Sequence, residues 1–164
     1  MRRLLARYAW LGAIVFGIVL IVAGAYMVLA GRQAHNDVRD TLAEEHIITS
    51  QNAEIPMKPV TGPAEAKAQA DQIKQDALNI TGGKTYVELP QNDPNRATYL
   101  NSVTLRTALM QSYMAFKVAD LVSGMGLLVA LLGVSSIALG TYLGFVVVRP
   151  PELARRGLTQ APNA

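Results

Sequence analysis

The sequence YAWLGAIVFGIVLIVAGAYMVLA, which occupies residues 8–30, decides the fold because it contains no charged side chain. A second uncharged stretch covers residues 121–148. A helix needs about 20 apolar residues to cross a hydrocarbon layer of about 30 Å, and its backbone groups must be bonded within the helix. Both stretches are long enough. We therefore predict an all-α membrane protein in which transmembrane helices over residues 8–30 and 118–148 form an antiparallel hairpin.

An apolar stretch near the N-terminus can also be a cleaved signal peptide. Arg2, Arg3 and Arg7 precede this one, and Leu29-Ala30-Gly31 resembles a cleavage site. The apolar core of a signal peptide, however, is only about 7–15 residues long. We therefore expect residues 8–30 to be a retained membrane anchor.

The composition agrees with a membrane protein. Of the 164 residues, 51% are hydrophobic and 16% are charged, against about 25% charged residues in typical soluble domains. The mean hydropathy is +0.22. The chain has no cysteine, which excludes disulfide frameworks, zinc–thiolate sites, iron–sulfur clusters and haem attached through cysteine.

The distribution of basic residues predicts the orientation in the cell membrane. Residues 1–7 carry three arginines and no acid, and residues 149–164 carry three arginines and one acid. The segment between the two stretches is close to neutral, with nine basic and ten acidic residues over 31–117. By the positive-inside rule, both termini are cytoplasmic and residues 31–117 are extracytoplasmic. The basic excess therefore reflects topology, and we expect no nucleic-acid partner.

Glycines recur at helical spacing in both predicted spans. They allow two backbones to approach closely, which favours helix association in lipid. The sequence leaves open whether these glycines pack the two spans on each other or dock one span on another membrane protein. The helix-packing candidates are Gly17, Gly24, Gly126, Gly133, Gly140 and Gly144.

Two charged residues stand at the outer edge of the second span. Lys117 and Asp120 are three positions apart, a spacing that brings side chains together on a helix. We predict an ion pair between them, with the lysine reaching toward the membrane surface.

The segment between the spans is expected to form a small, mostly helical cap on helical stalks. Pro63 opens a predicted helix over about 63–80, which Gly82 and Gly83 end. Its narrow apolar face contains Ala66, Ala70, Ile73, Ala77 and Ile80.

The next elements follow that helix directly. Residues 84–89 are expected to be extended. Asp93 is a favourable N-cap and Pro94 a favourable first residue for a long helix that starts at about 94 and continues through the second span.

The sequence contains no recognisable catalytic, cofactor-binding or metal-binding pattern. His35 and His46 are eleven positions apart and lack the i, i+4 spacing of metal ligands. Thr81-Gly82-Gly83-Lys84-Thr85 resembles the end of a phosphate-binding loop, but Leu78 replaces the glycine which that motif requires. We therefore expect the protein to be neither an enzyme nor a cofactor carrier.

Several motifs resemble a family of small two-span actinobacterial membrane proteins. They are G-P-x-x-A-x-x-Q-A-D-x-I at residues 62–73, GGKTYVEL at 82–89, DPNRAT at 93–98 and LRTAL at 105–109. Many members carry the name of an aromatic ring-opening dioxygenase alpha subunit, which would imply an iron site of histidines and a carboxylate. The histidines and carboxylates of the sequence show no spacing that could build such a site, so the resemblance implies topology and a bacterial source but no reaction.

These observations favour a non-catalytic accessory or scaffold subunit of a larger bacterial membrane complex. A respiratory complex and a lipid transporter are the hosts we consider. The alternative is an extracytoplasmic binding protein for a small apolar or lipid ligand. The cap residues expected to serve folding or partner contacts are Gly83, Lys84, Tyr86, Asp93 and Arg96.

Overall fold

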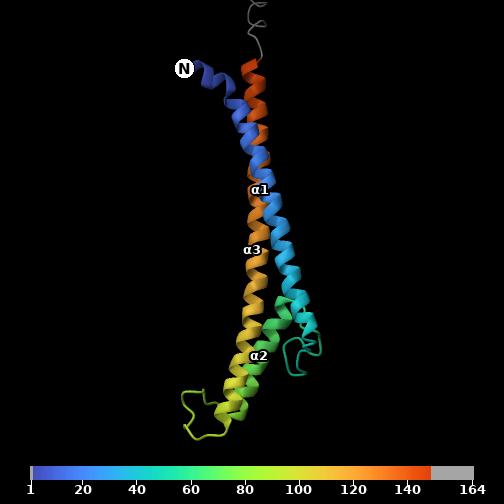
Figure 1. The fold of residues 1–164 in the computed structure, drawn as a ribbon, viewed down its shortest axis with the longest axis vertical. Helices are drawn as coiled ribbons and strands as arrows, with labels where there is room; N and C mark the ends of the chain where they lie inside the picture. The colour runs from blue at the N-terminus through green and yellow to red at the C-terminus, as the bar shows by residue number, and fades with distance from the viewer. Residues whose placement is uncertain (1, 149–164) are drawn as a thin grey trace, which may run out of the picture. The chain divides into compact units, whose positions relative to one another are not determined.

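The computed structural model describes residues 2–148, with side chains over residues 8–146, and contains three helices in that range (Figure 1). They are α1 (Arg2–Glu44), α2 (Pro63–Ile80) and α3 (Asn95–Val148). An isolated antiparallel bridge between Ile48 and Pro59 accompanies them. The predicted all-α class is confirmed. The predicted C-terminal tail, residues 149–164, lies outside the described residues.

Two of the helices have the length and apolar composition of membrane spans. The qualifying segments are Tyr8–Glu44 in α1 and Asn95–Val146 in α3. The prediction of two long apolar helices is therefore confirmed, and both helices extend well beyond the stretch that lipid would cover.

The chain divides into two compact units. The first consists of residues 1–27 and 125–164, of which α1 and α3 supply the described part, and we call it the pair unit. The second consists of residues 28–124 and includes all of α2, and we call it the three-helix unit. Each unit is described by itself below.

The three-helix unit has one small hydrophobic core. Figure 1 shows α2 lying beside the first half of α3. Leu42 from α1, Val60 from the connection to α2, and Leu109 and Phe116 from α3 form this core with two alanines of α2. Phe116 is fully buried. Because the core contains few large side chains, its stability depends on all three helices being together.

The buried face of α2 is made of small side chains. Ala66, Ala70 and Ala77 are at most 3% exposed, whereas Ile73 is partly buried against the core. Ile80, which the spacing places on the same face, is 52% exposed. Ile80 is the last residue of α2, so the face ends about one turn earlier than the sequence pattern indicates.

The end of α2 is fixed by two glycines. Gly82 and Gly83 have φ angles of +63° and +85°, which side-chain-bearing residues rarely adopt. The Gly83 amide donates to the Leu78 carbonyl at 2.7 Å. These glycines therefore close the helix with a left-handed turn.

Residues 86–88 form a turn, and the expectation of an extended segment over residues 84–89 is wrong. The amides of Glu88 and Leu89 donate to the Thr85 carbonyl at 3.0 and 3.2 Å. The Glu88 carboxylate in turn accepts hydrogen bonds from the Thr85 amide and hydroxyl, both at 2.7 Å. This local side-chain bonding competes with extended backbone and folds the segment back on itself.

The connection between α1 and α2 is held by a buried threonine. Thr49 is 1% exposed, and its hydroxyl accepts from the Lys58 amide at 2.8 Å. The Thr49 amide donates to the Lys58 carbonyl at the same distance. Next to it, the Ser50 amide donates to Gln69 Oε1 at 2.7 Å, which attaches the connection to α2.

Candidate contact surfaces

Glycines bring α1 and α3 into backbone contact in the pair unit. A Cβ atom added at Gly17 would lie 2.6 Å from the Gly133 carbonyl oxygen, and one added at Gly133 would lie 2.6 Å from that of Gly17. One added at Gly24 would lie 2.5 Å from the Gly126 oxygen. Gly17 thus meets Gly133, and Gly24, seven residues later in α1, meets Gly126, seven residues earlier in α3. The two segments therefore run antiparallel.

The other two glycine candidates lie against the first part of α1. A Cβ at Gly140 would come within 2.9 Å of Ile14 Cγ1 and of the Trp10 carbonyl oxygen. A Cβ at Gly144 would lie 3.1 Å from the indole of Trp10. All six glycine candidates are thus at the α1–α3 contact within this unit, whereas Gly12 has open space around it.

A hydroxyl links the same two helices. Ser136 Oγ donates to the Ala13 carbonyl at 2.9 Å, while neighbouring Ser135 donates to Leu131 within its own helix. The sequence identifies Ser136 only as a small residue. Its role as an interhelical donor depends on its position on the face that meets α1.

The outward faces of the pair unit are apolar. The large side chains that are more than half exposed include Val15, Phe16, Ile18, Val19 and Val22 of α1, and Leu127, Leu128, Leu131, Leu132 and Val134 of α3. An apolar surface of this extent is unfavourable in water and is typical of lipid or protein contact.

The three-helix unit contains a close contact at Gly31, which the sequence prediction left out of its glycine candidates. A Cβ at Gly31 would collide with the hydroxyl of Ser123 and lie 2.7 Å from the Ala119 carbonyl oxygen. Gly31 stands seven residues after Gly24, so the glycine repeat of α1 extends into this unit.

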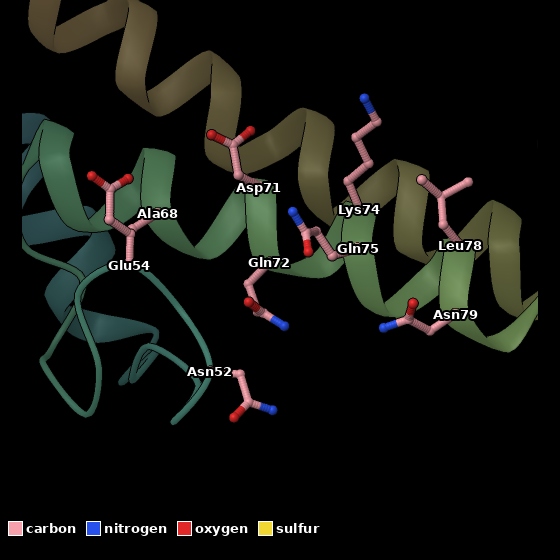
Figure 2. A pocket seen from close by; sticks show the side chains of 9 residues that line it. All are labelled: Asn52, Glu54, Ala68, Asp71, Gln72, Lys74, Gln75, Leu78 and Asn79. Atoms are coloured by element: carbon pink, nitrogen blue, oxygen red, sulfur yellow. The ribbon is translucent and has the colours of Figure 1, made fainter. Parts of the chain in front are cut away.

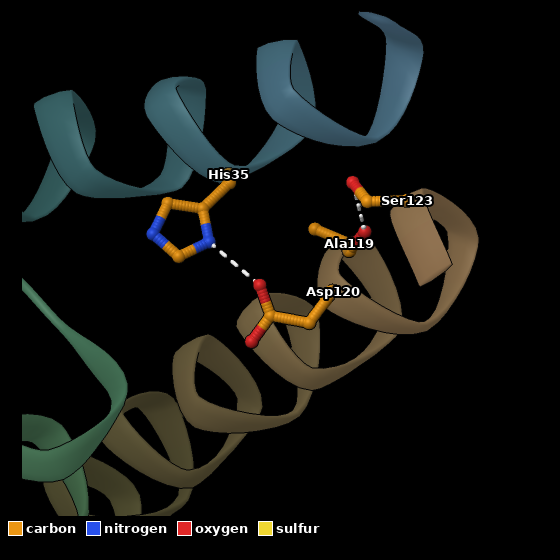
Figure 3. Close-up of polar contacts among 4 residues, drawn as sticks. All are labelled: His35, Ala119, Asp120 and Ser123. Carbon is orange, nitrogen blue, oxygen red and sulfur yellow. Dashed lines mark hydrogen bonds and ion pairs between the residues drawn. The ribbon is translucent and has the colours of Figure 1, made fainter. Parts of the chain in front are cut away.

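Asp120 pairs with a histidine, and the predicted Lys117–Asp120 ion pair is wrong. Asp120 Oδ1 lies 3.1 Å from His35 Nδ1. Figure 3 shows this contact between the two helices, with Ser123 bonded to the carbonyl of Ala119 in its own helix. The imidazole of His35 also lies against the ring of Phe116, with centroids 4.8 Å apart.

The lysine of the predicted pair has a different neighbour. Lys117 Nζ lies 5.6 Å from the ring centroid of Tyr113, one turn earlier in α3. Within α3, helical spacing would allow Lys117 to contact either Asp120 or Tyr113. The packing of α1, which brings His35 to Asp120, decides between these two contacts.

The motif residues of the α2–α3 connection hold its turns. Asp93 Oδ1 accepts from the Asn95 amide at 2.8 Å, which caps the start of α3. Arg96 donates to the Leu89 carbonyl at 2.7 Å and lies 4.1 Å from the ring centroid of Tyr86.

The Lys84 carbonyl completes the turn after α2. It accepts a hydrogen bond from the hydroxyl of Thr81 at 2.5 Å. Four of the five motif candidates, Gly83, Lys84, Tyr86 and Asp93, thus lie in the connection between α2 and α3, and Arg96 lies in the first turn of α3.

Two charged groups outside the spans have shifted pKa values. The hydrogen bonds from Thr85 lower the pKa of Glu88, because they favour its ionised form. The hydrogen bond from Lys67 to Asp71, 2.6 Å long, raises the pKa of the lysine, and the charge of Asp71 adds to that effect.

A polar hollow of about 530 Å³ lies between α2 and the connection before it (Figure 2). Four side-chain amides line it, together with Glu54, Asp71 and Lys74. Gln72 is bonded to Asp76 and Asp71 to Lys67. The hollow matches a hydrogen-bonding ligand better than an apolar one. The amide side chains belong to Asn52, Gln72, Gln75 and Asn79.

Across the part of the chain that the structure describes, no group of three or more potential ligand side chains is arranged to hold a metal ion. Comparison of the chain with family models, curated proteins and solved structures found no match.

Proposed function

We propose that this chain is a two-span membrane protein that serves as a non-catalytic accessory or scaffold subunit of a larger membrane complex. The observation that carries the proposal is the construction of the pair unit. Its glycines and Ser136 form the contact between α1 and α3, while its large apolar side chains face outward. Such a surface requires lipid or the helices of other subunits to cover it.

The proposed topology places the three-helix unit outside the cytoplasm as a cap on the extensions of α1 and α3. The charge distribution described above supports it through the positive-inside rule. The motifs at residues 62–73 and 82–98 support membership of the two-span actinobacterial family, in which this arrangement is expected.

Single cysteines test this topology cleanly because the chain has none of its own. Asn52→Cys, in the connection before α2, should react with a membrane-impermeant maleimide in intact cells. Thr159→Cys, near the C-terminus, should react only after the membrane is opened. Reaction of the second variant alone in intact cells would invert the proposed orientation.

Purification in a mild detergent tests the accessory role. A tagged chain expressed at its native level should elute with a defined set of membrane subunits in constant ratio, and should lose them when the pair unit is disrupted. Elution as a lone chain after nanodisc reconstitution from native membranes would contradict the accessory role.

The alternative function, binding of a small apolar or lipid ligand, is favoured by one observation. A hollow of about 350 Å³ between α1 and α3 of the three-helix unit is lined by Val38, Leu42 and Ala115, together with the polar residues Asp37, Thr41, Gln111 and Ser112. Native mass spectrometry of the purified chain would show a bound lipid of constant mass in that case. Val38→Trp, which fills the hollow, should release it.

A further inference from the structure

The polar hollow beside α2 has hydrogen-bonding groups that the protein itself does not use. Gln72, Gln75 and Asn79 occupy positions i, i+3 and i+7 of α2, so they lie along one face of the helix. Asn52 borders the hollow from the connection before α2. Among the described residues, the side-chain amides of Asn52, Gln75 and Asn79 form no hydrogen bond. The hollow therefore presents unpaired amides from two elements of the three-helix unit.

The fourth amide is held in place by its own helix. Gln72 Nε2 donates to Asp76 Oδ1 at 2.8 Å, which leaves the Gln72 carbonyl oxygen able to accept from a ligand. Figure 2 shows Gln72 and Asn79 on the same side of α2 as Asn52. A ligand in the hollow can therefore contact the helix and the connection together.

The charged residues around the hollow balance one another. Glu54, Asp71 and Lys74 line it. Lys67 Nζ lies 2.6 Å from Asp71 Oδ2, and the charge of Glu54 also raises the pKa of Lys67. Two carboxylates are thus matched by two ammonium groups. A charged ligand would gain no net attraction from this surface, so the charge balance favours a neutral one.

The size and composition of the lining narrow the ligand class further. The volume, about 530 Å³, falls within the range of about 300–1,000 Å³ typical of small-molecule sites. Of the described residues that line the hollow, Ala68 and Leu78 alone are apolar, whereas a bound peptide needs apolar pockets for its alternate side chains. A hydroxyl group both donates and accepts, as a side-chain amide does. A ligand rich in hydroxyls therefore matches the lining best.

We propose that this hollow is a binding site for a neutral sugar of one or two rings. The amides of Gln75 and Asn79 pair with neighbouring hydroxyls of the sugar, and Asn52 contacts it from the connection. The site goes beyond the accessory role proposed above. It also does not depend on the orientation in the membrane, because every lining residue belongs to the three-helix unit.

Titration of the full chain in phosphatidylcholine nanodiscs tests the proposal, because detergents with sugar headgroups would compete for the site. The probes are glucose, maltose, cellobiose, lactose and N,N′-diacetylchitobiose, followed by saturation-transfer NMR. At least one of them should bind saturably, with modest affinity because Asn52, Gln75 and Asn79 are exposed. Absence of saturable binding by all five would overturn the proposal.

A charge series tests the ligand class. Glucose, glucuronate and glucosamine share one ring and differ in charge. Glucose should bind at least as well as the two charged sugars, because the surface of the hollow carries no net charge. Clear preference for glucuronate or for glucosamine would overturn the assignment to a neutral ligand.

Two alanine variants test whether the sugar occupies the hollow. Gln75→Ala and Asn79→Ala should each weaken binding about fivefold, equivalent to one neutral hydrogen bond of about 1 kcal/mol. Both side chains are exposed, so neither substitution disturbs the core. Gln91→Ala is the matched control, because Gln91 is an exposed amide outside the hollow. Equal affinities in all three variants would place the sugar elsewhere and overturn the site.

Cysteine protection gives an independent measurement. Saturating sugar should slow the maleimide labelling of Asn52→Cys and leave that of Gln91→Cys unchanged. An unchanged rate at position 52 would contradict the site. Failure of these binding tests would leave the accessory role standing, since that role is measured by co-purification with other subunits.

Discussion

The carboxylate of Asp120 lies 3.1 Å from Nδ1 of His35, a residue 85 positions earlier in the chain. Because the two residues belong to α1 and α3, their contact reports on the pairing of these helices in the three-helix unit. Lys117, which is only one helical turn from Asp120, approaches the ring of Tyr113 instead.

A double-mutant cycle should detect this pair. The side chains are 34% and 53% exposed, and a polar contact between side chains at such exposed sites contributes about 0.2–1 kcal/mol. We expect His35→Ala and Asp120→Ala to show a coupling in that range, measured from unfolding curves in detergent followed by circular dichroism. Lys117→Ala and Asp120→Ala should be additive. Stronger coupling of Asp120 to Lys117 than to His35 would contradict the observed contact.

Two glycine-to-alanine substitutions in α1 should differ in their effect on stability. The added methyl group at Gly24 meets the backbone of Gly126 and Ala130 at 2.5 and 2.6 Å. We expect Gly24→Ala to destabilise the pair unit by about 1–3 kcal/mol through overpacking. At Gly12 the methyl group meets nothing within 4 Å, so Gly12→Ala should be neutral or stabilising because alanine favours helix.

The measurement for this glycine pair is unfolding in mixed SDS micelles, followed by the fluorescence of Trp10, the only tryptophan. A Gly24→Ala protein as stable as the wild type would mean that α1 and α3 do not meet through this face.

Ser136 and Ser135 provide a matched test of the interhelical hydrogen bond. Ser136 donates to α1 at Ala13, and Ser135 donates within α3. Hydrogen bonds between membrane helices contribute about 0.6 kcal/mol on average and at most about 1.7. Ser136→Ala should therefore lower the free energy of unfolding by about that amount more than Ser135→Ala, in the same micelle assay. Equal effects would show that the bond to Ala13 contributes nothing.

The turn at Thr85 should lose stability in acid. Its hydrogen bonds lower the pKa of Glu88 below the ordinary value of 4.5. A lowered folded-state pKa means that the stabilisation is complete above 4.5 and disappears as the pH falls through the lowered pKa. An NMR titration of the Glu88 side chain should therefore give a midpoint below 4.5. A midpoint at or above that value would contradict the turn.

Two variants complete the test of this turn. Thr85→Val removes the hydroxyl donor and should raise the midpoint of Glu88, whereas Thr98→Val, in α3, should leave it unchanged. A midpoint of Glu88 unaffected by Thr85→Val would assign the shift to the backbone amide alone.

The features that could be predicted from sequence are those encoded locally. Pro63 and the paired glycines after Thr81 determine the ends of α2 through backbone geometry, and Asp93 marks the start of α3 through capping. Absence of charge over two long stretches identifies α1 and α3 as apolar helices.

The features that escaped prediction depend on side chains that reach another element. Lys117 had two geometrically possible neighbours within α3, Asp120 and Tyr113, and the actual partner of Asp120 is on α1. Thr49 and Gln69 look like ordinary surface residues in the sequence, but they are buried where the connection after α1 crosses α2. No local periodicity contains that information.

The same reasoning explains the turn at residues 84–89. A pattern of threonine, tyrosine and valine favours extended backbone, yet the carboxylate of Glu88 satisfies two donors of Thr85 and reverses the chain. The competing interaction spans only three residues, so a sequence interpretation that weighed side-chain bonding could have found it.

The alanines of α2 have a consequence for how this protein can change over evolutionary time. Ala66 and Ala70 are completely buried. Besides alanine only glycine is small enough for these sites, and any larger side chain would push the helices apart. Homologous chains should therefore drift freely along the solvent side of α2 while these two sites remain almost fixed. In this region the most invariant positions would be these small, unreactive alanines, selected because they allow the helices to pack closely.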